Sequence, residues 1–259
     1  MTNAASYDER GLARDNQGRQ QVGVIIVTYS MSPVRLVSSI SSSRRIRYHV
    51  YHHGDKGLEN DIRSCFSDCD ASVNWLLENR GLAKSWNQGI MACVREQCDP
   101  ILIINDDVCF KMGAFDSWVR FLDESQDHGI GFVYGDEPQE NGGIITRSQN
   151  FSCFSLGRRA IEVVGAFDEA FVPAYFEDFD YFARVLEAGV RVVYCEESLI
   201  IHERSQTLKS SEKLRKELPE FFNRSREYFV RKWGGDTPEG RTFCHPFNDP
   251  TIPIFIPFR

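Results

Sequence analysis

The sequence predicts an α/β protein with a mostly parallel central sheet, helices on both faces of that sheet, and a second, smaller region. Strand-like segments at 22–30, 46–53, 72–79 and from residue 101 alternate with segments of helical periodicity. This β-α-β-α-β-α-β order is typical of a parallel sheet. Because such sheets bind ligands beyond the carboxyl ends of their strands, the polar residues at those ends are the first candidates for a functional site.

The helices of the first half follow ordinary sequence signals. In the segment 32–40, Ser32 is the candidate N-cap and Pro33 lies in the first turn. A second helix is expected at Leu58–Ser67. A third, at 81–97, has apolar residues four apart, namely Leu82, Trp86, Ile90 and Val94.

The second half is predicted to be more varied. Helices are expected at 114–125, 175–189 with Gly189 as candidate C-cap, and about 208–233. Short strands are expected at 129–135, at the start of 151–171 before a short helix, and twice within 190–203. The Gly- and polar-rich segment 136–150 is expected to be a mobile loop. Residues 245–259 contain four prolines, which exclude a regular helix and favour an extended arm packed on the body.

Composition narrows the class of protein. The chain has 259 residues with 42% hydrophobic and 26% charged content, ordinary for a globular protein. Its net charge of −7 argues against binding nucleic acid through phosphate neutralisation. We expect no transmembrane helix and no signal peptide, because no apolar run is long enough and the first 20 residues are polar.

Eight scattered cysteines complete no zinc pattern, so reduced and mostly buried thiols are expected.

The predicted location is the cytoplasm or the cytosolic face of a membrane. The predicted division is a disordered segment 1–20, two halves at 21–134 and 135–235, and the arm 236–259.

The segment "ILIINDDVCF" carries the first chemical signal. A buried apolar strand runs directly into Asn105, Asp106 and Asp107. Two adjacent carboxylates at a strand end suit Mg²⁺ or Mn²⁺, which bind one or two carboxylates together with phosphate oxygens. A turn with a helix-capping aspartate explains the same spacing equally well.

A second acidic cluster, in "PAYFEDFDYF", places Glu177, Asp178 and Asp180 at a helix start. The helix dipole alone favours carboxylates there, and a surface ion pair with Arg184 would account for Asp180. Three acids among aromatic residues also suit a general base in a partly apolar wall.

Two weaker signals accompany these clusters. His202 ends the apolar strand "SLIIHE", where it could be structural or could complete a metal site. The strand-to-helix turn Asn79–Gly89 contains Gly81, and its backbone amides with Arg80 or Lys84 could face an anion.

Taken in order, these stretches resemble the GT-A glycosyltransferases of family 2, especially the bacterial rhamnosyltransferase-like branch. The matching pieces are "VIIVTYS", "ENRGLAKSWNQGI", "LIINDDV", "VGAFDEAFVPAYFEDFDYFARVLEAGVRVVY", "IIHE" and "YFVRKWG". The resemblance covers roughly residues 22–234.

The resemblance implies a metal-dependent glycosyltransferase that inverts the anomeric centre, with Mg²⁺ or Mn²⁺ as cofactor. It would move a hexosyl or deoxyhexosyl group from a nucleotide-sugar donor to a hydroxyl of a glycan, a lipid-linked or another acceptor, as in polysaccharide biosynthesis. Residues 21–134 would bind the donor and residues 135–235 the acceptor, and the apolar tail could touch a membrane.

The same resemblance assigns roles to residues. Asp107 and His202 would hold the metal, Asp178 would be the base, and Glu177 would position the acceptor. The nucleotide and donor sugar would border Thr28, Tyr29, Asn79, Arg80, Gly81, Lys84, Asn87, Asn105 and Asp106.

One departure concerns the nucleobase. Where the family usually has "DNGS", this chain has "HHGD", with His52 and His53 at the place of the base-reading aspartate. An imidazole can donate or accept, unlike a carboxylate, so the sequence does not identify the nucleotide.

Three rival functions stay open. A sugar-nucleotide-forming nucleotidyltransferase uses a related sheet but wants a Gly-rich, basic signature after the first strand, which "VTYSMSPVRL" lacks. A non-catalytic sugar-nucleotide or glycan-binding relative would bind donor without turnover. A transferase acting on nucleic acid is disfavoured by the net charge.

Overall fold

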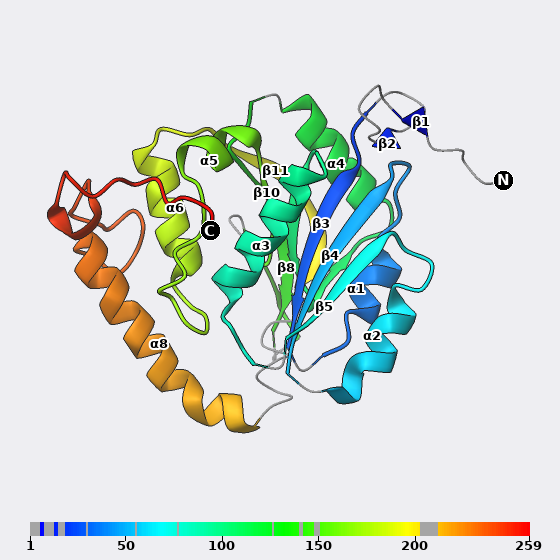
Figure 1. The fold of residues 1–259 in the computed structure, drawn as a ribbon, viewed down its shortest axis with the longest axis horizontal. Coiled ribbons are helices and arrows are strands. Elements are labelled where there is room, and N and C mark those ends of the chain that lie inside the picture. The colour runs from blue at the N-terminus through cyan, green and yellow to red at the C-terminus, as the bar shows by residue number, and fades with distance from the viewer. Residues whose placement is uncertain are drawn as a thin grey trace.

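A computed structural model describes residues 6–7, 13–14, 19–29, 31–54, 56–76, 78–125, 127–139, 142–147, 151–202 and 212–259. Within these residues, nine strands form one sheet (Figure 1). They are β3 (Val22–Thr28), β4 (Ile46–His53), β5 (Ala71–Leu76), β6 (Ile101–Asn105), β7 (Val108–Phe110), β8 (Ile130–Pro138), β9 (Ile144–Arg147), β10 (Cys153–Leu156) and β11 (Val192–His202). Their order is β5-β4-β3-β6-β10-β8-β11-β7, with β9 paired to β8.

Most strands of the sheet point the same way. The neighbours β5, β4, β3 and β6 are parallel to one another, and β11 is parallel to β8. The antiparallel β10 lies between β6 and β8, so β8 points in the same direction as β6. The carboxyl ends of these strands therefore meet at one edge, which confirms the predicted mostly parallel sheet.

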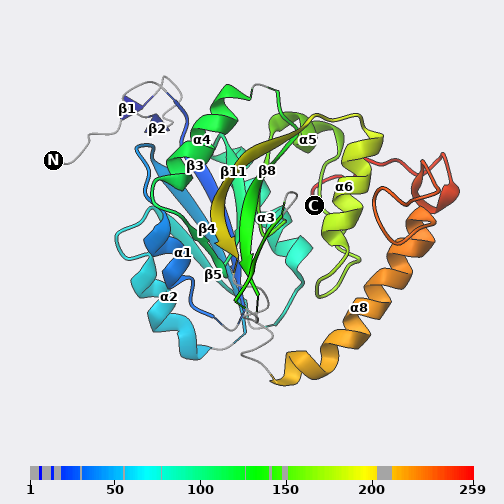
Figure 2. The ribbon, with the colours of Figure 1, turned by 180° about the vertical axis from the view of Figure 1, so that it is seen from behind.

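Helices cover both faces of the sheet, as Figures 1 and 2 show from opposite sides. One face is covered by α1 (Val34–Ser39), α2 (Glu59–Cys65) and α4 (Ala114–Glu124), and the other by α3 (Leu82–Arg95), α5 (Arg158–Val163) and α6 (Glu177–Glu187). The longest helix, α8 (Glu212–Trp233), lies along the outer side of α6.

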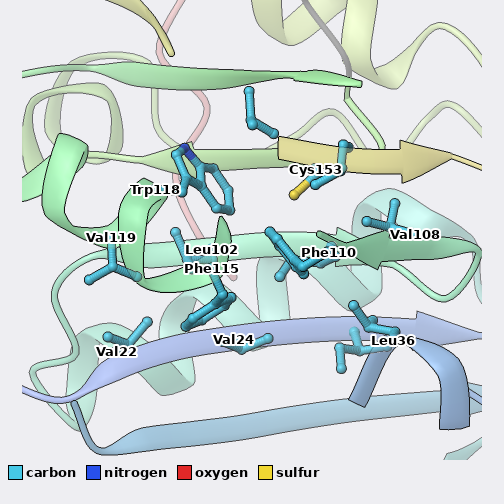
Figure 3. Packing of buried hydrophobic residues seen from close by; sticks show 14 of the residues in the cluster. Val22, Val24, Leu36, Leu102, Val108, Phe110, Phe115, Trp118, Val119 and Cys153 are labelled. Carbon is cyan, nitrogen blue, oxygen red and sulfur yellow. The ribbon is translucent and has the colours of Figure 1, made fainter. Parts of the chain in front are cut away.

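Strand alternation distributes the core between these two faces. Val22 and Val24 of β3 pack with Phe115 and Trp118 of α4 (Figure 3), whereas Ile25 belongs to the core cluster on the α3 face. This period of two is what a strand buried on both sides requires. Burial of apolar side chains on both faces stabilises the sheet at about 25 cal/mol per Å².

Several predicted elements need correction. Helix α1 begins after Pro33 without a side-chain cap, so Ser32 is not its N-cap. The two strands expected within 190–203 are the single strand β11, whose register shifts between Cys195 and Ile200. The described part of the loop expected at 136–150 is the β8–β9 hairpin. Residues 140–141 and 148–150 lie outside the described residues, as do 208–211 of the expected long helix.

The two ends of the chain differ in how they are held. In the segment expected to be disordered, β1 (Ser6–Tyr7) pairs with β2 (Ala13–Arg14), and the rest, apart from residues 19–20, lies outside the described residues. The C-terminal segment contains the 3-10 turn η2 (Pro246–Asn248) and is held by Ile256, whose amide donates to Val164 and whose carbonyl accepts from Ala166. These two hydrogen bonds hold Ile256 against the turn that follows α5.

Two further expectations concern cysteines and membrane spans. All eight cysteines are free thiols, but only four are buried, namely Cys93, Cys98, Cys153 and Cys195. Within the described part of the chain, no helix combines the length and apolar character needed to cross a bilayer.

One short element completes the description of the first half: a 3-10 turn, η1 (Lys56–Leu58), precedes α2.

Candidate active site

A cavity of about 590 Å³ opens at the edge where the parallel strands end. The six strands that share this direction each have a lining residue at or just after their carboxyl end. These residues are Thr28 and Tyr29 for β3, His53 for β4, Asn79 for β5, Asn105–Asp107 for β6, Glu137 for β8 and His202 for β11. The opposite wall comes from the start of α6 and from α8.

The structure brings most of the predicted site residues together. The residues that line the cavity are Thr28, Tyr29, Asn79, Asn105, Asp106, Asp107, Glu177, Asp178 and His202. Five others are not on its lining, namely His52, Arg80, Gly81, Lys84 and Asn87. Four carboxyl groups from the two acidic clusters, those of Asp106, Asp107, Glu177 and Asp178, therefore face one space.

Asp107 and His202 are adjacent because of a strand register. Strand β11 pairs antiparallel with β7, which places His202 opposite Val108 and next to Asp107. His202 Nε2 lies 3.2 Å from Asp107 Oδ1. Asp107 Oδ1 and His202 Nδ1 are buried and make no hydrogen bond with the described residues. A proton or a cation between His202 Nε2 and Asp107 Oδ1 would give Oδ1 a partner, while His202 Nδ1 faces Glu137 Oε1 at 3.7 Å.

The same pair fits a small divalent cation. Two ligands at right angles around an octahedral Mg²⁺, each about 2.1 Å from the ion, lie about 3 Å apart. In the described residues no group of three or more His, Cys, Asp or Glu side chains is placed to hold a metal ion. Such an ion would therefore take Asp107 and His202 with water or phosphate oxygens, as Mg²⁺ commonly does.

Asp106 is chemically distinct from its neighbour. Its side chain is buried and its Oδ2 has no hydrogen-bond partner in the described residues. Burial, and then the charge of Asp107, raise the pKa of Asp106 to about 8. Asp106 is therefore largely protonated at neutral pH and can donate a hydrogen bond.

Glu177 and Asp178 begin helix α6 at the cavity wall. The two preceding residues, Tyr175 and Phe176, have φ values of 78° and 69°, in the left-handed region that non-glycine residues rarely occupy. Such strain persists only where surrounding packing enforces it, and it gathers at functional sites. Here Phe176 packs into an aromatic cluster, with ring centroids 5.5 Å from Phe229.

Both carboxyls resist ionisation. Burial raises the pKa of Asp178 to about 6, although the amide of Phe179 donates to its Oδ1 at 2.8 Å. Burial, and then Asp178, raise the pKa of Glu177 well above its ordinary range. Because two adjacent carboxylates repel each other, the more deeply buried Glu177 stays protonated while Asp178 ionises near neutral pH.

A buried ionic network fixes α6 against α8. Asp180 Oδ1 accepts from Trp233 Nε1 at 2.9 Å and lies 2.7 Å from Lys232 Nζ, and its Oδ2 accepts from Arg184 at 2.9 Å. Asp180 and Arg184 are both fully buried, so the ion pair expected on the surface lies in the interior. This network holds the helix that carries Asp178.

The two adjacent histidines have different roles. His52 is buried, its Nδ1 lies 2.7 Å from Thr28 Oγ1, and its ring meets Trp75 edge-on. His53, which lines the cavity, has Nδ1 3.0 Å from Asn79 Oδ1 and Nε2 2.7 Å from Ser85 Oγ. The amide oxygen can only accept, so Nδ1 donates and Nε2 accepts. Burial lowers the pKa of His53, and its neutral ring has both nitrogens engaged.

Asn87 and Gly81 serve the fold in this arrangement. The Asn87 amide accepts from Phe167 N and donates to Phe167 O and to Glu169, so its hydrogen-bonding groups are occupied. Gly81 has φ +91°, a backbone conformation that side chains disfavour, and its amide donates to Asn79 Oδ1. This turn sets Asn79 at the cavity.

Sequence reasoning missed two charged residues of the site. Glu137 and Arg147 line the cavity from the β8–β9 hairpin, in the segment expected to be a loop. The polar and glycine-rich composition of 136–150 concealed the strand pairing. The aromatic residues expected around the second acidic cluster include Phe179, which lines the cavity, but sequence reasoning did not place Phe151 and Phe221 beside it.

Comparison with solved structures decides the fold. S. aureus TarS superposes with a TM-score of 0.57 over 77% of this chain at 13% identity. GalNAc-T7 with UDP, GalNAc and Mn²⁺ does so with a TM-score of 0.59 over 90% of this chain at 10% identity. The fold is that of the GT-A glycosyltransferases. The edge that holds the cavity in this chain is where a GT-A sheet ends its parallel strands.

A third neighbour, residues 1–349 of S. aureus TarS in complex with UDP, gives a TM-score of 0.55 at 13% identity over 72% of this chain. The chain spans only 40% of the first TarS structure and 51% of the GalNAc-T7 structure. No family model matches the sequence. A comparison with curated proteins gives no match either.

Proposed function

We propose that the protein is a metal-dependent, inverting glycosyltransferase that moves a sugar from a nucleotide-sugar donor to a hydroxyl acceptor. The observation that carries this proposal is that Asp107, His202 and Asp178 line one cavity at the carboxyl edge of a GT-A sheet. The neighbours that hold UDP, and in one case Mn²⁺, support a nucleotide donor and a divalent ion.

The metal proposal rests on two ligands from this chain. Asp107 and His202 would hold Mg²⁺ or Mn²⁺, because His202 Nε2 lies 3.2 Å from Asp107 Oδ1 and that oxygen has no hydrogen-bond partner in the described residues. When bound, the ion neutralises the negative charge that grows on the diphosphate leaving group. Asp106, largely protonated, would hydrogen-bond to a donor hydroxyl or phosphate oxygen.

Asp178 is the proposed general base. With a pKa of about 6, it is ionised at neutral pH yet basic enough to take a proton from an acceptor hydroxyl in the transition state. Attack of that oxygen from the side opposite the leaving diphosphate would invert the anomeric centre. Glu177, protonated, would donate a hydrogen bond that positions the acceptor.

The proposal also covers the family branch, the donor sugar and the division of the chain between donor and acceptor. We place the chain with family 2 and its rhamnosyltransferase-like branch, with a hexosyl or deoxyhexosyl donor. Residues 21–134 would mainly serve the donor and 135–235 the acceptor, although both parts contribute strands to one sheet. The proposed setting is polysaccharide biosynthesis in the cytoplasm or at the cytosolic face of a membrane.

A screen of nucleotide sugars tests the proposal. UDP-, GDP-, dTDP-, CDP- and ADP-sugars are added with and without Mn²⁺, and thermal unfolding and release of the free nucleotide are measured. A donor should raise the unfolding temperature, because it binds only the folded state, and should be slowly hydrolysed in the presence of the metal.

Variants sharpen this screen. Asp178→Asn should retain the thermal shift and lose hydrolysis, while Asp61→Asn, which changes an exposed carboxylate of α2, should behave as the parent. Binding without any turnover or transfer would favour a non-catalytic binding protein. Release of pyrophosphate from a nucleoside triphosphate and a sugar 1-phosphate would favour a nucleotidyltransferase.

A further inference from the structure

The cavity has an unusual charge balance for a site that takes an anionic donor. Its lining contains five carboxyl groups, from Asp106, Asp107, Glu137, Glu177 and Asp178. Among the described lining residues, Arg147 is the only lysine or arginine. A nucleotide-sugar carries two negative charges on its diphosphate, which one divalent ion would match in formal charge. The ionised carboxylates of the lining add further negative charge, so another cation in the cavity wall would favour donor binding.

Arg147 is held in the cavity wall by a defined contact. In the β8–β9 hairpin, Arg147 pairs with Gly135 and Ile145 pairs with Glu137, so Arg147 and Glu137 are diagonal neighbours on one face. Gly135 has no side chain to block the arginine. Arg147 Nε donates to Glu137 Oε2 at 2.6 Å.

Among the described residues, this contact is made by the Nε of Arg147 and not by its two terminal nitrogens. The Arg147 side chain is 45% exposed, whereas that of Glu137 is only 2% exposed. Within the part of the chain that the structure describes, the two terminal nitrogens of Arg147 have no hydrogen-bond partner. A planar guanidinium with four free N–H groups matches phosphate oxygens better than any other side chain.

The hairpin also connects Arg147 to the candidate metal ligands. Glu137 Oε1 lies 3.7 Å from His202 Nδ1, and His202 Nε2 lies 3.2 Å from Asp107 Oδ1. Side chains of β9, β8, β11 and the β6–β7 turn thus follow one another along the cavity wall. An anion bound by Asp107 and His202 through a metal would lie on the same side of the cavity as Arg147.

We propose that Arg147 binds the donor diphosphate directly and that Glu137 positions it by holding its Nε. This inference rests on the proposed function, because it names the diphosphate-binding cation of the same site. The assignment makes the β8–β9 hairpin part of the donor site, although it lies in the half of the chain proposed to serve the acceptor.

The test measures phosphate binding by calorimetry in the presence of Mg²⁺. UDP, GDP, dTDP, CDP and ADP are compared, and the tightest of them is used together with inorganic pyrophosphate, which lacks a base. Arg147→Ala should weaken both ligands by about 10-fold to 100-fold, the effect of losing one charge-assisted contact. Arg147→Lys should lose less than Arg147→Ala, because it keeps the positive charge. It should not restore full affinity, because an ammonium lacks the paired N–H groups with which a guanidinium binds phosphate.

Lys111→Ala is the matched control. Lys111 is exposed to a similar degree, at 43%, and pairs with Asp136 of the same strand as Glu137, but it does not line the cavity. Its loss should leave both affinities unchanged. Thermal unfolding of each variant shows whether it is folded, and Arg147→Lys keeps the question answerable if Arg147→Ala is not.

The outcomes separate the two proposals. Equal affinities of wild type, Arg147→Ala and Lys111→Ala for the diphosphate would overturn the role of Arg147 alone. A loss of nucleotide binding with unchanged pyrophosphate binding would also overturn it, because the arginine would then contact the base or ribose. If wild type binds none of the five nucleotides with Mg²⁺, the proposed function fails and this inference falls with it.

Discussion

His202 Nε2 lies 3.2 Å from Asp107 Oδ1, and this contact is produced by the antiparallel pairing of β11 with β7. The two residues come from opposite halves of the chain, each at the end of a strand. Neither position is informative alone, since a strand-end histidine is often structural and a strand-end aspartate often belongs to a turn. Their adjacency beside Asp178 in one cavity supports a metal and diphosphate site.

Substitution of the proposed base should separate binding from chemistry. Asp178→Asn keeps the shape of the side chain and its hydrogen bond from Phe179, so donor affinity should stay within about two-fold of wild type. Transfer should fall by about 10²-fold to 10⁴-fold, the usual contribution of a positioned base. The measurement is single-turnover transfer alongside calorimetric donor binding.

The neighbouring carboxyl provides the comparison for that variant. Glu177→Gln mimics the protonated form that Glu177 adopts, because burial raises its pKa well above the ordinary range. It should therefore lose much less activity than Asp178→Asn. Similar losses in the two variants would show that the roles of base and positioning group are wrongly divided.

The pH dependence of transfer should report Asp178. Its pKa is raised to about 6 by burial, and only its ionised form can accept a proton. The value of kcat/KM should therefore be constant above about pH 7 and fall tenfold per pH unit below about 6. An acid limb near pH 4, where an ordinary aspartate titrates, would contradict the assignment of the base.

The network around Asp180 should dominate the stability of the α6–α8 contact. Asp180→Asn leaves buried positive charge of Arg184 and Lys232 uncompensated and should lower the free energy of unfolding by about 3–5 kcal/mol. The milder Trp233→Phe removes one donor to Asp180 and should lower it by about 1–3 kcal/mol. Urea unfolding at pH 7 measures both.

The same network has a predicted pH dependence. Burial alone would raise the pKa of Asp180, but Lys232 and Arg184 outweigh it, so the folded-state pKa is lowered. A lowered pKa stabilises the fold above the unfolded value, about 3.9, and this stabilisation is lost as pH falls through the folded value. The stability difference between wild type and Asp180→Asn should persist at pH 5 and shrink below pH 4. A difference that vanished between pH 7 and pH 5 would refute this explanation.

The sheet could be predicted from local patterns, and the corrections show where such patterns fail. Strands β3 and β6 are apolar over most of their length and bounded by polar turns, so their positions follow from sequence alone. The hairpin of β8 and β9 was missed because the four residues of β9 are exposed. An exposed strand shows no apolar alternation, and only its pairing with β8 defines it.

The same contrast between local sequence patterns and pairing of distant segments applies to the residues of the site. Residues at the ends of successive parallel strands, such as Thr28 and Asp107, could be predicted because topology alone brings strand ends together. Which of His52 and His53 faces the cavity could not be predicted. Strand alternation puts two adjacent residues on opposite faces of the sheet, but it does not tell which face meets the cavity. Glu137 and Arg147 depend on pairing between segments whose composition resembles a loop.

The most direct test of the account is calorimetry of a nucleoside diphosphate with wild type and Asp107→Ala, each with and without Mn²⁺. Wild type should bind at least about ten-fold more tightly with the metal, because Asp107 and His202 would hold the ion and its charge would offset that of the diphosphate. Asp107→Ala should bind weakly and equally in both conditions. Equal affinity in all four measurements would contradict a metal–diphosphate site at the end of β6.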